Sequence, residues 1–355
     1  MTAADMETTQ PRPGYTISRV IRGNWQLAGG HGTIDHETAL DDLEASFDSG
    51  VFTFDCADIY TGVEEIIGAF RGRLAARRGA EAARRLRVHT KLVPDLDRLS
   101  TVNKAYIEAI VDESLRRLRT EQLDLVQFHW WDYGQPGAVE ALLWLNEIRR
   151  TGKIRNLGAT NFDTPHTQAI LAAGVPLMSM QTQYSLLDTR PENGLVEVCR
   201  AADVVLLCYG TVAGGFLGER WLGVPEPTGL LENRSLTKYK LIIDDFGGWD
   251  LFQALLRTCR TIADRHGVDI ATVASRAVLD RPGVAAVIVG GRNRSHVAMN
   301  ARIGSLRLTA EDTSELRGVL DRRSGPTGDT YTLERDRTGR HGAIMKYNLN
   351  AGVST

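Results

Sequence analysis

The chain has 355 residues, of which 43% are apolar and 24% are charged, and its formal net charge at pH 7 is −2. These values are typical of a soluble globular protein, and the balanced charge argues against nucleic acid or an anionic membrane as a partner. The polar segment 1–13 lacks the features of a signal peptide, and no apolar run approaches the ~18 residues that span a bilayer. We therefore expect a cytoplasmic protein.

The cysteines make no CxxC pair and have no His-flanked ligand spacing. This pattern predicts reduced, mostly buried thiols and no metal site. The four positions are Cys56, Cys199, Cys208 and Cys259.

Segments typical of strands and helices alternate after Tyr15. Strand-like runs occur at 23–26, 51–55, 87–91, 124–129, 154–159, 177–181, 204–209 and 284–289. Helix-like segments occur at 37–49, 63–78, 103–119, 139–150, 165–173, 192–202, 249–266, 270–279 and 295–303. Eight strand–helix alternations over roughly 300 residues predict a (β/α)8 TIM barrel as one domain over 15–322. The alternative is an open doubly wound sheet, whose first turn would carry GxGxxG, but the glycines at 29–32 lack that spacing.

Three segments lie outside the alternation. The N-terminus, 1–14, is expected to be flexible. The segment 210–248, after the seventh strand, contains Gly and Pro and is long enough to be a functional lid or a disordered loop. The tail, 323–355, is polar, and we expect it to be partly disordered or to dock over the pocket mouth or a neighbouring subunit.

Polar side chains follow three successive strands. Asp55 and Tyr60 follow the second strand, Lys91 the third and His129 the fourth. Because the carboxyl ends of barrel strands open onto one face, these side chains are expected to meet there. Singly, each has a structural alternative, such as an ion pair or a core histidine, but together they indicate a proton-delivery site.

Carbonyl reduction suits this group of side chains. A free phenol has a pKa of about 10, and a charge ~4 Å away at an effective dielectric of 20 is worth about 4 kcal/mol, or up to ~3 pKa units. Lys91 can therefore lower the pKa of Tyr60, while Asp55 keeps the amine charged and His129 donates to or orients the substrate oxygen. No side chain supplies a hydride, so a nicotinamide cofactor is implied.

At these residues the chain resembles the aldo-keto reductase superfamily over 15–303, in the blocks Phe54-Asp55-Cys56-Ala57-Asp58-Ile59-Tyr60, His89-Thr90-Lys91 and Gln127-Phe128-His129-Trp130. The resemblance implies a (β/α)8 barrel that reduces aldehydes and ketones with NADPH. It makes Tyr60 the general acid, Lys91 its pKa-lowering partner, Asp55 the support for Lys91, and His129 the orienting group.

The resemblance also implies the nicotinamide and substrate contacts. Asn161, beside Thr160, would bind the carboxamide together with Gln181, and Tyr209 would stack on the ring. Asn24 would contact the cofactor, and tryptophans would line the substrate pocket. These are Trp25, Trp130 and Trp131.

The adenosine end matches the family less closely. The segment 289–300 resembles the region that holds the adenosine phosphate, in which Arg292 or Arg294 could pair with a 2′-phosphate and favour NADP over NAD. Gly210 stands where a Ser is usual in the family, so a pyrophosphate contact there would come from the backbone or be lost. The expected contacts of this end are Gly210, Gly290, Gly291, Arg292, Arg294 and Asn300.

The predicted function is NADPH-dependent reduction of an aldehyde, ketone or sugar-like carbonyl. Two alternatives stay open. One is an NADP-binding partner subunit like the potassium-channel β subunits, which share the barrel. The other is physiological oxidation of a sugar or secondary alcohol with NADP⁺. The sequence specifies neither the substrate nor the oligomeric state.

Overall fold

The computed structural model describes all residues except 1–5, 29–34, 292–293 and 346–355. Its centre is a closed barrel of parallel strands in the order β10-β3-β4-β5-β6-β7-β8-β9. The strands are β3 (Val20–Gly23), β4 (Thr53–Asp55), β5 (Arg87–Leu92), β6 (Leu123–Phe128), β7 (Ile154–Thr160), β8 (Leu177–Gln183), β9 (Val205–Tyr209) and β10 (Val284–Gly290). The predicted (β/α)8 fold is therefore confirmed.

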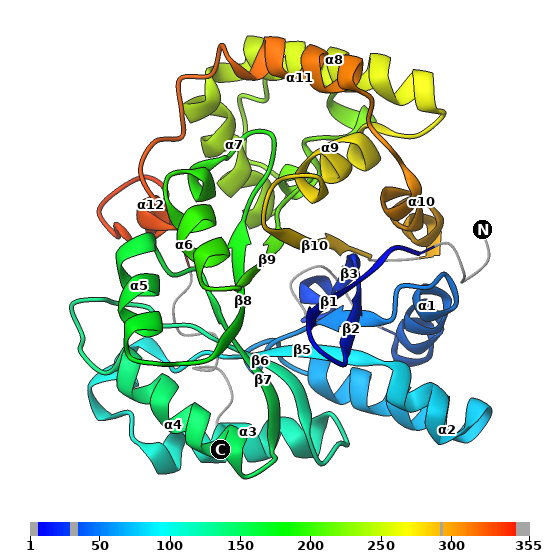
Figure 1. The fold of residues 1–355 in the computed structure, drawn as a ribbon. Coiled ribbons are helices and arrows are strands. Elements are labelled where there is room, and N and C mark those ends of the chain that lie inside the picture. Colours follow the sequence, from blue (N-terminus) through cyan, green and yellow to red (C-terminus); the bar gives the residue numbers. More distant parts are fainter. Residues whose placement is uncertain (1–5, 29–34, 292–293, 346–355) are drawn as a thin grey trace.

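The helices surround the barrel (Figure 1). They are α1 (His36–Asp48), α2 (Val63–Arg85), α3 (Lys104–Arg117), α4 (Ala138–Arg150), α5 (Thr164–Ala172), α6 (Leu195–Ala201), α7 (Arg234–Phe246), α8 (Gly248–His266), α9 (Ile270–Leu279), α10 (Arg294–Ser305), α11 (Ala310–Leu320) and α12 (Thr332–Arg335). Several of these helices begin directly after a short polar residue that caps the first turn. Asp35, Asn103 and Asp163, for example, each accept a hydrogen bond from a backbone N–H in the first turn.

Strand register brings the polar strand ends together. Asp55 of β4 pairs with His89 of β5, and Lys91, two residues further on, pairs with Gln127 of β6. On the far side, Gln181 of β8 pairs with Thr160 of β7. The carboxyl ends of β4 to β8 therefore form one continuous rim.

The structure corrects three expectations. The first barrel strand is Val20–Gly23 and not 23–26, and the chain turns into a 3-10 helix at Trp25. The N-terminus is not flexible throughout, because β1 (Thr8–Arg12) pairs with β2 (Tyr15–Ser18) in an antiparallel hairpin. The segment 210–248 is not only a loop, because it contains α7.

Helix α7 has a clear apolar face. The Gly and Pro residues near it in the sequence had favoured the prediction of a loop. Asn233 caps its first turn, and its buried positions include Leu236, Tyr239, Ile243 and Phe246. These side chains join a second hydrophobic cluster, formed with α8, α9 and α11, beside the main barrel core. The cluster fixes α7 next to the mouth of the barrel.

Within the described residues, none of the helices combines the length and apolar character needed to cross a bilayer.

Candidate active site

Three of the four expected catalytic side chains lie together near the ends of β4 and β5, where Asp55 and Lys91 are buried and Tyr60 is partly buried. The Lys91 amine donates to Asp55 Oδ1 at 2.6 Å and to the Cys56 carbonyl at 2.9 Å. The same nitrogen lies 5.0 Å from the centre of the Tyr60 ring. The ammonium therefore lies next to both the carboxylate of Asp55 and the ring of Tyr60.

The barrel interior holds Asp55 in place from the opposite side. Its second oxygen, Oδ2, accepts from Gln127 Nε2 at 3.1 Å and from Gln181 Nε2 at 2.7 Å. Because both carboxylate oxygens are engaged, the carboxylate cannot rotate away from the amine. This role for the two glutamines was not apparent from the sequence, since they come from β6 and β8.

The electrostatic balance at Tyr60 differs from the expectation. Burial raises the pKa of Tyr60 above its usual value of 10, and although Lys91 lowers it by charge and hydrogen bonding, Asp55 raises it again. The carboxylate, only 2.6 Å from the amine, cancels much of the charge on which the expected lowering depended. The phenol therefore stays protonated at neutral pH.

Lys91 itself remains charged. Burial alone would lower its pKa, but the charges of Asp55 and Tyr60 and the hydrogen bond to Asp55 raise the pKa above its usual value. A buried ammonium that keeps its proton can stabilise negative charge as it develops on the neighbouring phenol.

His129 lies at the end of β6, against the neighbouring strand. Its Nδ1 is 3.0 Å from the Thr160 carbonyl oxygen, and the side chain is 3% exposed. The rings of Trp131 and Tyr331 pack edge-on against it, with ring centres 4.5 and 5.9 Å away. Burial, helped by the charge of Arg335, lowers the pKa of His129 to about 3 despite the hydrogen bond to Thr160, so the imidazole is neutral.

Residues 329–341 of the C-terminal tail, which we call the strap, cross the carboxyl ends of β6, β7 and β8. The guanidinium of Arg335 donates to the carbonyls of Trp130 and Trp131, at 2.6 and 2.7 Å, and to the carbonyl of Asn161 at 2.9 Å. It also lies 3.8 Å above the centre of the Tyr133 ring. The strap thus supplies hydrogen-bond donors to backbone carbonyl groups in the loops after β6 and β7.

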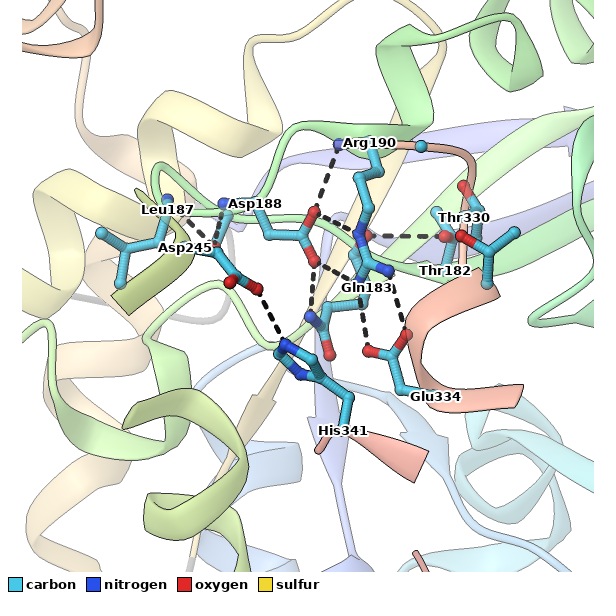
Figure 2. Close-up of polar contacts among 12 residues, drawn as sticks. Thr182, Gln183, Leu187, Asp188, Arg190, Asp245, Thr330, Glu334 and His341 are labelled. Carbon is cyan, nitrogen blue, oxygen red and sulfur yellow. Dashed lines mark hydrogen bonds and ion pairs between the residues drawn. The ribbon is translucent and has the colours of Figure 1, made fainter. Parts of the chain in front are cut away.

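Glu334 fastens the strap through a buried cluster of charges (Figure 2). Its two oxygens accept from the Arg190 guanidinium at 3.0 Å each, and Arg190 also pairs with Asp188 at 2.8 Å. The amine of Lys238, on α7, lies 3.7 Å from Glu334. Burial alone would raise the pKa of Glu334, but the charges of Arg190 and Lys238 lower it to about 2.

Each end of the strap has its own contact. At its start, Asp329 accepts from the backbone N–H and the hydroxyl of Thr164, the first residue of α5. At its end, the imidazole of His341 lies 2.8 Å from a carboxylate oxygen of Asp245 on α7, as Figure 2 shows. No local sequence pattern indicates these pairs, because the partners are far apart along the chain.

The expected nicotinamide end fits a bound cofactor in part. Thr160 Oγ1 is buried and has no hydrogen-bond partner among the residues that the structure describes, which suits a ligand contact at this position. Asn161 adopts a left-handed backbone conformation, with φ of 62°, and its Oδ1 accepts from the Tyr209 hydroxyl at 2.8 Å. By contrast, the amide nitrogen of Gln181 is engaged by Asp55 inside the barrel.

The expected adenosine end is organised by a residue that the sequence did not point to. The buried Arg22 donates to the Gly291 carbonyl at 2.6 Å, and Asn300 donates to the Gly290 carbonyl at 3.0 Å. A Cβ on Gly291 would lie 3.1 Å from Arg22, so the absence of a side chain permits this close approach. Arg292 and the side chain of Arg294 lie outside the described residues.

Gly210 follows the expected stacking tyrosine at a position that only glycine suits. Its φ is +77°, and a Cβ there would collide with the hydroxyl of Tyr239 on α7. Nearby, the amide of Asn24 donates to the Asp55 carbonyl at 3.0 Å, which ties the end of β3 to that of β4.

The three tryptophans expected to line the substrate pocket differ in their placement. Trp25 is 41% exposed and packs against Tyr60, with ring centres 4.8 Å apart, and Trp131 packs against His129. Trp130 instead packs in the main core next to Phe128, and its indole N–H donates to the Gln135 carbonyl at 2.9 Å. The expected role of Trp130 in the pocket wall is therefore not supported.

Among the described residues, no group of three or more His, Cys, Asp or Glu side chains is arranged to hold a metal ion.

The barrel and its polar rim are those of an oxidoreductase family. The model of the aldo/keto reductase family matches residues 19–321, so this chain belongs to that family.

The individual relatives and solved structures named below have low sequence identity to this chain. Flagellar radial spoke protein 5 of Chlamydomonas reinhardtii is 28% identical, over 63% of this chain and 49% of its own length, so the chain spans about half of that relative. The NADH-specific methylglyoxal reductase of Escherichia coli (strain K12) is 25% identical, over 86% of this chain and 95% of that protein. The solved structure of a glycerol dehydrogenase from Gluconobacter oxydans has a TM-score of 0.73 at 25% identity, and covers 92% of this chain and 98% of that one.

Proposed function

We propose that this chain reduces an aldehyde, ketone or sugar-like carbonyl to the alcohol, with NADPH as cofactor and Tyr60 as general acid. The observation that carries the proposal is the buried Lys91 amine, which contacts Asp55 at 2.6 Å and lies 5.0 Å from the Tyr60 ring. A structural ion pair alone would not need a phenol beside it at the barrel mouth, where this fold places its active sites.

The proposed chemistry divides into hydride and proton transfer. The nicotinamide, when bound, supplies the hydride to the carbonyl carbon. Tyr60 gives its proton to the carbonyl oxygen, and the resulting phenolate is stabilised by the adjacent ammonium of Lys91. The raised pKa of Tyr60 supports this direction, because an acid must hold its proton until the oxygen becomes basic.

For the cofactor, Thr160, Asn161 and Tyr209 would hold the nicotinamide end, and the backbone of Gly290 and Gly291 the adenosine end. The orphaned Thr160 hydroxyl and the tight approach of Arg22 to Gly291 support such a site. The proposed preference for NADP over NAD rests on Arg292 and Arg294. Because one relative is named as NADH-specific, the test below compares NADPH with NADH.

For the tail, we propose that the strap forms one wall of the substrate pocket, because Tyr331 packs against His129. We place the activity in the cytoplasm, since all four cysteines are free and buried, as is usual in a reducing compartment.

Two other functions have weaker support. Oxidation of a sugar or secondary alcohol receives support from the glycerol dehydrogenase neighbour, although the protonated Tyr60 favours reduction. A role purely as a partner subunit has less support, since the side chains needed for proton transfer are all present.

The test is a steady-state assay of cofactor oxidation with a panel of aldehydes, ketones and open-chain sugars, run in parallel with NADPH and NADH. We expect turnover of at least one carbonyl class and a higher kcat/KM with NADPH. Tight NADPH binding without turnover of any carbonyl would contradict the proposal and favour the partner-subunit function.

A further inference from the structure

Arg22 is a buried cation in a part of the barrel wall that is otherwise apolar. On β3, successive side chains face opposite sides of the sheet: Ile21 packs with residues from strands across the barrel, whereas Val20 belongs to the main core outside it. Arg22 faces outwards as Val20 does, towards α1, which lies beside α10 (Figure 1). Its side chain is only 3% exposed. A charge is costly at such a position, where an apolar residue would pack well.

Neutral oxygens surround the guanidinium of Arg22. It donates to the backbone carbonyls of Asp42 and Gly291, at 3.1 and 2.6 Å, to Asn24 Oδ1 at 3.2 Å, and to the hydroxyl of Ser46. Burial lowers the pKa of Arg22 to about 10, although the more distant carboxylate of Asp42 raises it in part, so the group stays charged at neutral pH. Among the residues that the structure describes, none forms an ion pair with Arg22.

The small cavity beside Arg22 supplies no negative charge either. Apart from Arg22, it is lined by valines, serines and Asn300, which are all uncharged. The hydrogen bonds thus satisfy the N–H groups of the guanidinium but leave its charge without a counter-ion in this part of the described chain. A buried charge without a partner is unfavourable, and charges interact more strongly where water is excluded. An anion that binds close to Arg22 therefore gains from its charge.

Arg22 lies directly behind the two glycines that follow the end of β10. It holds the carbonyl of Gly291, while Asn300 holds that of Gly290. A Cβ on Gly291 would lie 3.1 Å from the guanidinium, and one on Gly290 would lie 3.0 Å from the amide nitrogen of Gln26. Because neither glycine has a side chain, only the backbone separates Arg22 from the position proposed above for the adenosine end of the cofactor.

We propose that Arg22 is a positioning residue for the adenosine end of the cofactor. Its guanidinium fixes the backbone of Gly291 from behind, and its unpaired charge attracts the phosphate groups of an adenosine nucleotide that binds on the other side of that backbone. This inference rests on the proposed function and extends it, because Arg292 and Arg294 were expected to pair with the phosphate directly. Arg22 acts through the glycines and does not touch the ligand.

The test measures the affinity for each half of the cofactor by NMR titration. Arg22→Met keeps a long side chain but removes its charge and its donors. We expect the Kd for 2′,5′-ADP to rise by about 10-fold, which corresponds to ~1.4 kcal/mol, while the Kd for nicotinamide mononucleotide stays within about twofold of wild type. At saturating NADPH, kcat should likewise stay within about twofold, so that the loss appears in the KM for NADPH. Equal Kd values for 2′,5′-ADP in Arg22→Met and wild type would overturn the inference.

Two further variants distinguish this role from a purely structural one. Arg12→Met is the matched control, because Arg12 also donates to a backbone carbonyl at 2.6 Å, that of Leu177, but at the opposite end of the barrel. It should leave both affinities unchanged. Arg22→Lys keeps the charge, and we expect its Kd for 2′,5′-ADP to lie within about threefold of wild type. Binding by Arg22→Lys as weak as that by Arg22→Met would overturn the inference.

A measurement on the wild-type protein does not depend on the folding of Arg22→Met. The ¹⁵Nε signal of Arg22, assigned by its loss in Arg22→Lys, should shift when 2′,5′-ADP binds and stay in place with nicotinamide mononucleotide. An unchanged signal at saturating 2′,5′-ADP would overturn the inference. The outcomes also separate the inference from the proposed function. Wild-type protein that binds neither NADPH nor 2′,5′-ADP would overturn both, whereas binding that Arg22→Met leaves unchanged would overturn the inference alone.

Discussion

The buried carboxylate of Glu334 is expected to control how often the strap opens. Both of its oxygens bind Arg190 at 3.0 Å, and Lys238 lies 3.7 Å away. Glu334→Gln keeps the size of the side chain but removes its negative charge. Arg190 and Lys238 are then left with Asp188 as the remaining carboxylate of this cluster. A buried ion pair that loses one partner is strongly destabilised.

The depressed pKa of Glu334 gives the size of the stabilisation that Glu334→Gln should remove. A shift from the unperturbed value of about 4.3 to about 2 corresponds to ~3 kcal/mol, at 1.36 kcal/mol per pKa unit. Because the folded-state pKa is depressed, this contribution is complete above about pH 4.3 and is lost as the pH falls through 2. We therefore expect the opening equilibrium of the strap at pH 7 to increase by about 100-fold in Glu334→Gln.

The assay is amide hydrogen exchange within the strap. The N–H groups of Arg335 and Asp336 bind the carbonyls of Tyr331 and Thr332, at 3.2 Å each, and they report opening directly. Glu311→Gln, at an exposed position on α11, is the matched control and should leave their exchange unchanged. Equal protection of these amides in Glu334→Gln and in the wild type would refute the argument that the charge cluster holds the strap.

Three further changes test other parts of the site. Lys91→Met should lower kcat by roughly 10²-fold or more, because the phenolate formed at Tyr60 loses its stabilising charge; a wild-type kcat would contradict this role. Since the pKa of Tyr60 lies above 10, carbonyl reduction should stay constant with pH up to about 10 and fall above it, while alcohol oxidation should rise; a pH–rate profile that falls near pH 7 would oppose this. Gly210→Ala should lower the free energy of unfolding by about 1 to 3 kcal/mol, measured by urea denaturation, because its φ is +77° and the new Cβ meets Tyr239.

The sequence predicted the barrel well because its signals are local. Seven of the eight expected strand segments closely overlap the strands found, from β4 to β10. The first strand was displaced, because β3 is short and the chain runs from Gly23 directly into a 3-10 helix. Helix α7 was missed, although Asn233 and the apolar positions from Leu236 to Phe246 carry a helical pattern.

Part of the site depends on contacts that no local pattern contains. Glu334 and Arg190 are 144 positions apart, so neither residue indicates the other. The pKa of Tyr60 depends on burial and on how closely Asp55 neutralises Lys91, which only the three-dimensional arrangement specifies. Which of two adjacent tryptophans faces His129 is likewise decided by the path of the loop after β6.

The central claim is that the Tyr60 hydroxyl delivers the proton, and Tyr60→Phe tests it most directly. The variant keeps the ring and removes only the hydroxyl. Its affinity for NADPH, followed by fluorescence titration, should remain within about threefold of wild type, while kcat/KM for the best carbonyl substrate should fall by roughly 10²- to 10⁴-fold. Undiminished turnover in Tyr60→Phe would contradict the account.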